Sequence, residues 1–206
     1  MDSIRLATEQ RMVRPRYERG DLDARTRIAE AFWTLIGERP YHEVSVLELV
    51  RRAGVNKNTF YYHFANIDEM AATIVAQTLD NDAFTRMAAS IDALGSEAVG
   101  PDDARLNQAF ERLGLIAGNH SSPALRELLK NVISKSWCER YSINLEVASA
   151  EDRVSFEFAL GGVLAVIGMR PSHTDDLTFR RILSFGLRDD VFQRLHAIAR
   201  RTQTTA

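Results

Sequence analysis

The stretch of residues 45–64 constrains the fold more than any other part of the chain. Ser45, followed three residues later by Glu48, is a capping box, which marks the start of a helix. Gly54 lies where that helix has to end, because glycine adopts a left-handed backbone conformation without steric cost. Asn56 is a suitable N-cap for a second short helix directly after it. Two short helices joined by a tight turn predict a helix-turn-helix, whose second helix can lie in the major groove of DNA.

The second of these helices is rich in polar and aromatic side chains and poor in aliphatic ones. Its first residues occupy the positions from which a recognition helix reaches base edges. Lys57 is suited to a guanine or a phosphate, Asn58 to an adenine, and Thr59 to a phosphate or a thymine methyl group. We therefore predict DNA contacts for these three residues.

The turn and the second helix also agree in register with a known protein family. The sequence AGV at 53–55, followed by TFYYHF at 59–64, resembles the DNA-binding domain of the TetR/AcrR family of bacterial transcriptional regulators. The resemblance covers roughly residues 24–72, and beyond them it is limited to length and helical rhythm. It implies a dimeric regulator that binds a palindromic operator in double-stranded DNA, most often as a repressor that a small-molecule effector releases.

The resemblance assigns roles to the aromatic residues of the second helix. Tyr62 and His63 would donate to DNA phosphates, while Phe60 and Phe64 would pack inward. Tyr61 is also included among the residues expected to bind DNA. The alternative is that Phe60, Tyr61 and Phe64 only hold the domain together. Two further roles remain open for Ser45, which can act as a helix cap or as a phosphate donor.

A preceding helix is expected from Asp23 to about Arg39, with Pro40 ending it. Family-like docking would bring Arg25 and Arg27, in its first turn, close to the DNA backbone; otherwise they are simply solvated. Where the family commonly has a lysine that contacts phosphate, this chain has Ile67, for which we predict a packing role.

The rest of the chain repeats the same helical rhythm, and no segment has the alternating, β-branched pattern of strands. The fold class is therefore predicted to be all-α. The expected organisation is a polar arm of residues 1–22, a helix-turn-helix head of residues 23–66, and a larger body for effector binding and dimerisation of residues 67–206. The arm carries five arginines and four acidic residues, and it is either loosely docked or reaches DNA.

Boundaries of the body helices follow from caps and from glycine and proline positions. Between residues 124 and 146 the pattern predicts a short and a longer helix, divided near Lys130. The other helices are expected from Asn66 to about Leu94, Asp103 to Gly118, Ser149 to before Pro171, Thr174 to about Gly186, and Asp189 to about Arg201.

One body helix contains two adjacent glycines in an apolar run, at a cost of about 1 kcal/mol each relative to alanine. Close approach of another helix would offset that cost. The resemblance implies that this approach occurs between subunits, in a four-helix bundle; the alternative is a helix of the intramolecular core. The stripe expected at the dimer interface is Phe158, Gly162, Ala165 and Met169.

An effector pocket is expected among the body helices, where polar and aromatic groups interrupt apolar faces. Its candidate lining is Phe110, Trp137, Cys138 and Tyr141. For each of these residues, an ordinary position in the core is the alternative, and no ligand class follows from them.

The sequence contains no motif of a catalytic, phosphate-binding or metal site, and its five histidines are not spaced as ligands. We therefore expect no enzymatic activity, no cofactor and no metal. Cys138 is the one cysteine, either a structural residue or a redox-sensing thiol, and it favours a reducing compartment. The N-terminus lacks a signal peptide and the longest apolar run, of 12 residues, is too short to span a bilayer, so a cytoplasmic location is expected.

Charge is distributed unevenly between the two ends of the chain. Residues 1–64 contain 11 Lys/Arg and 9 Asp/Glu, whereas residues 65–206 contain 15 and 19, so the net charges are +2 and −4. The sign suits an N-terminal domain that faces phosphates. Two alternatives remain: a DNA-binding protein of this fold without an effector, and an enzyme or protein-interaction module with a vestigial head.

Overall fold

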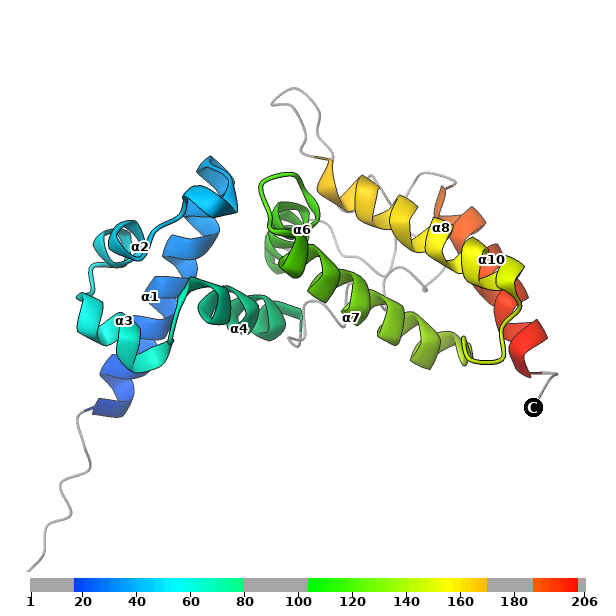
Figure 1. Cartoon of the computed structure of the whole chain (residues 1–206), viewed down its shortest axis with the longest axis horizontal. Helices are drawn as coiled ribbons and strands as arrows, with labels where there is room; N and C mark the ends of the chain where they lie inside the picture. Colours follow the sequence, from blue (N-terminus) through cyan, green and yellow to red (C-terminus); the bar gives the residue numbers. More distant parts are fainter. Residues whose placement is uncertain (1–16, 80–103, 170–186, 204–206) are drawn as a thin grey trace, which may run out of the picture.

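The computed structural model describes residues 17–79, 104–169 and 187–203. Within these ranges the secondary structure is entirely helical, with eight α-helices and one 3-10 turn and no strand. Three helices form the head at one end of the molecule, and four form most of the body at the other end, with α4 between them (Figure 1). The elements are α1 (Tyr17–Glu38), η1 (Tyr41–Glu43), α2 (Val46–Ala53), α3 (Lys57–His63), α4 (Ile67–Leu79), α6 (Ala104–Ala117), α7 (Pro123–Tyr141), α8 (Ala150–Gly168) and α10 (Leu187–Gln203).

The first helix is longer than its sequence suggests. We expected it to begin at Asp23, but α1 begins at Tyr17 and runs through Gly20. A single glycine costs a helix about 1 kcal/mol relative to alanine, which the residues on both sides of it can offset. The nearest proline, Pro15, precedes the first helical residue and so does not interrupt the helix.

Side-chain caps are present at four helix starts. The side-chain oxygens of Ser45, Asn56, Ser122 and Ser149 accept the backbone N–H three residues on, which satisfies one of the free donors of each helix. Asn66 caps α4 in the same way, with its Oδ1 2.8 Å from the backbone N of Glu69. The N-caps therefore position the helices as their local sequences indicate.

The prediction of two helices between residues 124 and 146 is wrong. A single helix, α7, continues past Lys130 to Tyr141, because residues 124–141 contain neither glycine nor proline. It ends at Ser142, which takes a left-handed conformation with φ 54°. The helix expected from Thr174 to Gly186, and the part of α4 expected beyond Leu79, lie outside the described residues.

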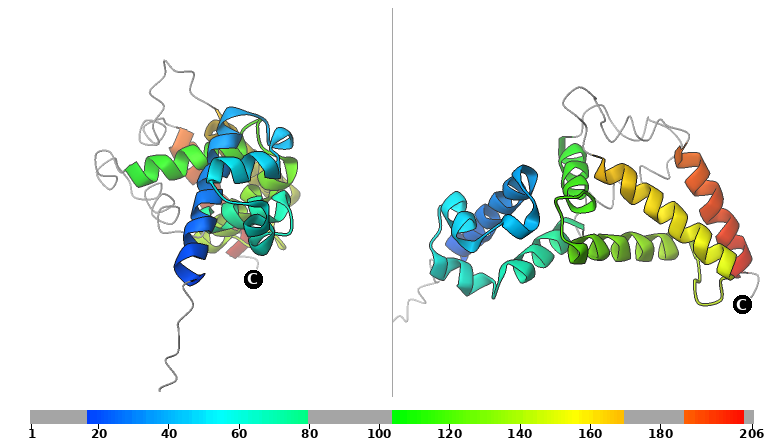
Figure 2. Two further views of the ribbon diagram at one scale, coloured as in Figure 1. Left: turned by 90° about the vertical axis from the view of Figure 1, so that its left-hand side faces the viewer. Right: turned by 45° about the horizontal axis from the view of Figure 1, so that its top comes forward.

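A continuous hydrophobic core runs from the head into the body. In the head, Phe32 of α1 and Phe60 of α3 are fully buried, and Ile67 packs against this core as predicted. In the body, Phe156 and Leu160 of α8 are fully buried between neighbouring helices. The right-hand view of Figure 2 shows α7, α8 and α10 converging at the end of the molecule away from the head.

The body meets the head through polar contacts as well as through α4. Arg112 of α6 forms an ion pair with Glu30 of α1, with 2.7 Å between Nη2 and Oε1, and its guanidinium lies 5.4 Å from the Trp33 ring centroid. In η1, the backbone N–H of Tyr41 donates to the carbonyl of His120, in the loop before α7, over 2.6 Å. These contacts connect α1 and η1 directly to the part of the body that begins at α6.

Candidate nucleic-acid interface

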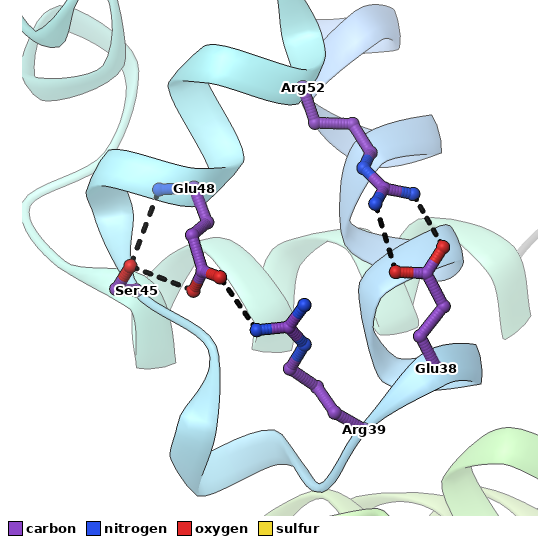
Figure 3. A network of polar contacts seen from close by, with 5 residues as sticks. All are labelled: Glu38, Arg39, Ser45, Glu48 and Arg52. Carbon is purple, nitrogen blue, oxygen red and sulfur yellow. Dashed lines mark hydrogen bonds and ion pairs between the residues drawn. The ribbon is translucent and has the colours of Figure 1, made fainter.

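The first helix of the helix-turn-helix begins at a network of side chains around Glu48 (Figure 3). The Oγ of Ser45 accepts from the Glu48 backbone N–H at 3.3 Å and donates to its carboxylate at 3.0 Å. Arg39 pairs with the other carboxylate oxygen at 2.6 Å. The Ser45 hydroxyl and the Arg39 guanidinium hold the pKa of Glu48 below its usual value. Ser45 therefore acts as the cap, one of its two predicted roles.

A second ion pair fixes the same helix against the end of α1 (Figure 3). Arg52 donates from its two Nη atoms to the two Glu38 carboxylate oxygens, over 2.6 and 2.9 Å. These bonds lower the pKa of Glu38, because they favour its charged form. Both partners are partly exposed, so the ion pair orients α2 against α1 but adds little to the free energy of unfolding.

The turn between the two helices is bonded on several sides. Gly54 adopts the left-handed conformation expected of it, with φ 63° and ψ 35°, and its N–H points to carbonyls of the last turn of α2. Arg27 of α1 donates from Nη1 to the carbonyls of Ala53 and Gly54, at 3.3 and 3.1 Å. Arg27, for which we expected a position near the DNA backbone, is thus bonded to the turn itself.

The second helix, α3, presents one polar and one buried side. Asn56 accepts from the backbone N–H of Thr59 at 2.8 Å and from its hydroxyl at 3.1 Å, so part of the Thr59 side chain serves the cap. Lys57, Asn58 and Tyr61 are exposed, and Tyr62 is 72% exposed. On the other side Phe60 and Phe64 are buried, 5.8 Å apart between ring centroids, as the resemblance implies.

His63 lies between the exposed and the buried side of α3. Its Nδ1 accepts from the Nε of Arg25 at 3.2 Å, which requires a ring protonated at Nε2 only. The Arg25 guanidinium also lies 5.9 Å from the Phe64 ring centroid. The structure therefore joins Arg25 and His63 to each other, and phosphate contacts by either residue remain predictions.

Two exposed residues of α2 were not selected from the sequence. Leu47 and Arg51 lie one turn apart, and within the described residues neither Arg51 nor Lys57 has a carboxylate or carbonyl partner for its side chain. Leu47 and Arg51 both lie on the face of α2 opposite the buried Leu49, and this helical spacing could have identified them from the sequence as exposed. A cation left unpaired beside the recognition helix is available to a phosphate.

The residues expected at a dimer interface share one face of α8. Phe158 is 70% exposed, and Gly162, Ala165 and Met169 are exposed as well. A Cβ added at Gly161 or Gly162 would meet nothing within 4 Å. Within the described residues, therefore, no other helix covers this part of α8.

The candidate pocket residues are distributed over the body helices. On α7, Trp137 packs edge-on against Phe156 at 5.8 Å, and Tyr141 lies 5.3 Å from the His196 ring of α10. Burial raises the pKa of Tyr141 to about 12 and also raises the pKa of the Cys138 thiol, which favours the protonated form of the thiol. Phe110, on α6, is half-buried against the core.

The described ranges contain neither a candidate metal site nor a membrane-spanning helix. No three His, Cys, Asp or Glu side chains there converge in a way that would hold a metal ion. None of the helices described has the length and apolar character needed to cross a bilayer.

A match to a known protein family falls on the region whose geometry is described above. Residues 28–74 match the family model described as bacterial regulatory proteins, tetR family. The matched segment extends from the buried part of α1 through α2, the Gly54 turn and α3 into α4. The chain therefore carries the helix-turn-helix DNA-binding domain of TetR-family transcriptional regulators, and every regular element in its described residues is helical.

Proposed function

We propose that the protein acts as a homodimeric repressor that binds a palindromic operator and leaves it when a small molecule binds the body. The observation that carries the DNA-binding part is the surface of α3. One side of α3 is exposed and carries Lys57, Asn58, Tyr61 and Tyr62. The other side packs into the core of the head through the buried Phe60. Such a face is suited to base edges and phosphates in a major groove.

Dimerisation is supported by the exposed face of α8. Val154 and Phe158 are each 70% exposed and Met169 is 62% exposed, which is unusual for large apolar side chains clustered on one helix. Between them, Gly161 and Gly162 leave open space in which a second helix can approach closely. A second copy of the chain would cover this face symmetrically and pair two heads with the two halves of a palindrome.

The contacts between body and head support control by the body. Arg112 binds Glu30 and stacks on Trp33, and the loop before α7 bonds to Tyr41. Tyr41 also donates to Asp68 at the start of α4, over 2.6 Å. A ligand that shifts α6, α7 or α4 would therefore change the orientation of the head. A coupling free energy of about 1–3 kcal/mol is typical of such a switch.

DNA binding is tested with a mobility-shift titration on a duplex that covers the region upstream of the protein's own gene. We expect binding that weakens steeply with salt. The double variant Lys57→Ala/Tyr62→Ala should bind about 10- to 100-fold more weakly, because it loses two groups exposed on the recognition helix.

The matched control is Lys135→Ala, which removes a cation from an exposed position on α7 and should leave DNA affinity unchanged. If the double variant and the unchanged protein had equal DNA affinity, α3 would not be the recognition helix. Full operator binding that no small molecule weakens would favour a regulator without an effector.

A further inference from the structure

We infer that Arg27 is a positioning residue for DNA binding: it sets the angle of the recognition helix by bonding the turn, and it does not contact DNA itself. The inference rests on DNA binding by the head, and neither repression nor an effector enters it. Its basis is the pair of bonds from Nη1 to the carbonyls of Ala53 and Gly54, at 3.3 and 3.1 Å.

These two carbonyls are acceptors that the helix cannot satisfy itself. The last carbonyls of an α-helix have no partner within the helix. At the end of α2, the N–H of Val55 donates to Val50 over 3.0 Å, and the N–H of Gly54 donates to Arg51 over 3.3 Å. The left-handed conformation of Gly54 turns the following peptide away from the helix axis, so the carbonyls of Ala53 and Gly54 need an external donor. Arg27 provides it from α1.

The charge of Arg27 adds to these bonds. The C-terminal end of a helix carries partial negative charge, which a cation near its last turn stabilises. Hydrogen bonds from a charged donor are also stronger than bonds between neutral groups. Arg27 therefore holds the end of α2 against α1 more firmly than a neutral side chain would.

The bonded turn is also where the direction of α3 is decided. Only Val55 and the cap residue Asn56 separate Gly54 from the first residue of α3. A rotation at Gly54 would move all the exposed side chains of α3 together. By bonding both peptides around this point, Arg27 limits that rotation and pre-orders the recognition helix for the groove.

Most other arginines described in the head are already bonded to protein groups, which limits the number of cations that can contact phosphates. Arg39 and Arg52 are paired with Glu48 and Glu38. Arg27 is bonded to the turn, whereas Lys57 and Arg51 are exposed without such partners. Removing Arg27 and removing Lys57 each delete one positive charge, but only the loss of Lys57 should change the number of neutralised phosphates.

The first test measures amide hydrogen exchange on the free, full-length protein. Replacing Arg27 with methionine keeps the aliphatic stem and removes the donors and the charge. The Arg27→Met variant should exchange the Gly54 and Val55 amides on the order of tenfold faster, while amides in α7 exchange as before. Unchanged exchange at the turn would overturn the inference, whether or not a DNA target is known.

The second test compares the salt dependence of binding to the upstream duplex. Arg27→Met should lower affinity on the order of tenfold at every salt concentration, with the slope of log K against log[salt] unchanged. Lys57→Met, the matched control, should reduce that slope by about one unit per head.

An equal loss of slope in Arg27→Met would make Arg27 a phosphate contact and would contradict the positioning role. Absence of DNA binding by the unchanged protein would instead count against the proposed function, and the exchange measurement would then decide the role of Arg27 alone.

Discussion

Asp152 is a buried carboxylate that joins α8 to α10. Its Oδ1 accepts from the Nε of Arg201 at 2.9 Å, and its Oδ2 accepts from the Ser149 hydroxyl at 2.9 Å. These bonds hold the pKa of Asp152 below its usual value of 3.8, and the bonds from Arg201 have the larger effect. The carboxylate therefore stabilises the folded state through its charged form.

This lowered pKa makes the stability of the body dependent on pH in the acid range. The unfolded chain binds the proton more readily, so the contribution is complete above the ordinary aspartate pKa and is lost as pH falls through the lowered value. We expect the free energy of unfolding to decrease below about pH 4, and to decrease less steeply in Asp152→Asn. Denaturant titrations at several pH values measure this free energy of unfolding for both proteins.

The control for this measurement is Asp190→Asn, at an exposed position at the start of α10. Its acid dependence should match that of the unchanged protein. Identical pH profiles for Asp152→Asn and the unchanged protein would show that Asp152 contributes nothing through its charge.

At the scale of elements, α8 is the helix whose exposed face requires a partner. Replacing Phe158 with glutamate would place a charge in the predicted seam, where desolvation costs several kcal/mol unless the charge is paired. The Arg194 guanidinium lies 5.5 Å from the Phe158 ring centroid, at the edge of the same face. We expect Phe158→Glu to sediment as a monomer at micromolar concentration, whereas the unchanged protein sediments as a dimer.

Val147→Glu provides the matched control, because Val147 is an exposed apolar residue in the loop between α7 and α8, apart from the α8 stripe. This variant should remain dimeric. A dimer that tolerates glutamate at 158 would place the subunit interface elsewhere.

The elements of the head could be predicted because their signals are local. Ser45, Gly54 and Asn56 act on backbone groups within a few residues of themselves, so their caps and the turn follow from the sequence. The roles of Arg27 and Arg52 could not be predicted in this way. Their partners, in the turn and at the end of α1, are brought to them only by the packing of α1 against α2.

The glycines of the body show the same limit. The pair at 161–162 was the visible signal of close helix packing, yet nothing lies within 4 Å of a Cβ built there. The close approach within the chain occurs instead at Gly114 and Gly168, where such a Cβ would lie 2.9 Å from the Ile167 carbonyl oxygen and 3.0 Å from the Ala117 carbonyl. Which glycines face a neighbour depends on how α6 crosses α8, and the spacing of glycines in one helix does not contain that information.

At the scale of the molecule, the described residues connect the head to the body through α4 (Figure 1), through the shared hydrophobic core and through polar contacts. The polar contacts run from α6 and the loop after it to α1 and η1. Two heads held in this way on a symmetric dimer would have a defined separation. That separation determines which spacing of half-sites the protein can bind.

The most direct test of this account is a hydroxyl-radical footprint of the full-length protein on the duplex from its own upstream region. Two heads in consecutive major grooves predict two protected segments related by a palindrome, with centres about one helical turn, ~10 base pairs, apart. Phe158→Glu should lose this paired protection at protein concentrations that saturate the unchanged dimer. A single protected segment, or no protection at low salt, would contradict the account.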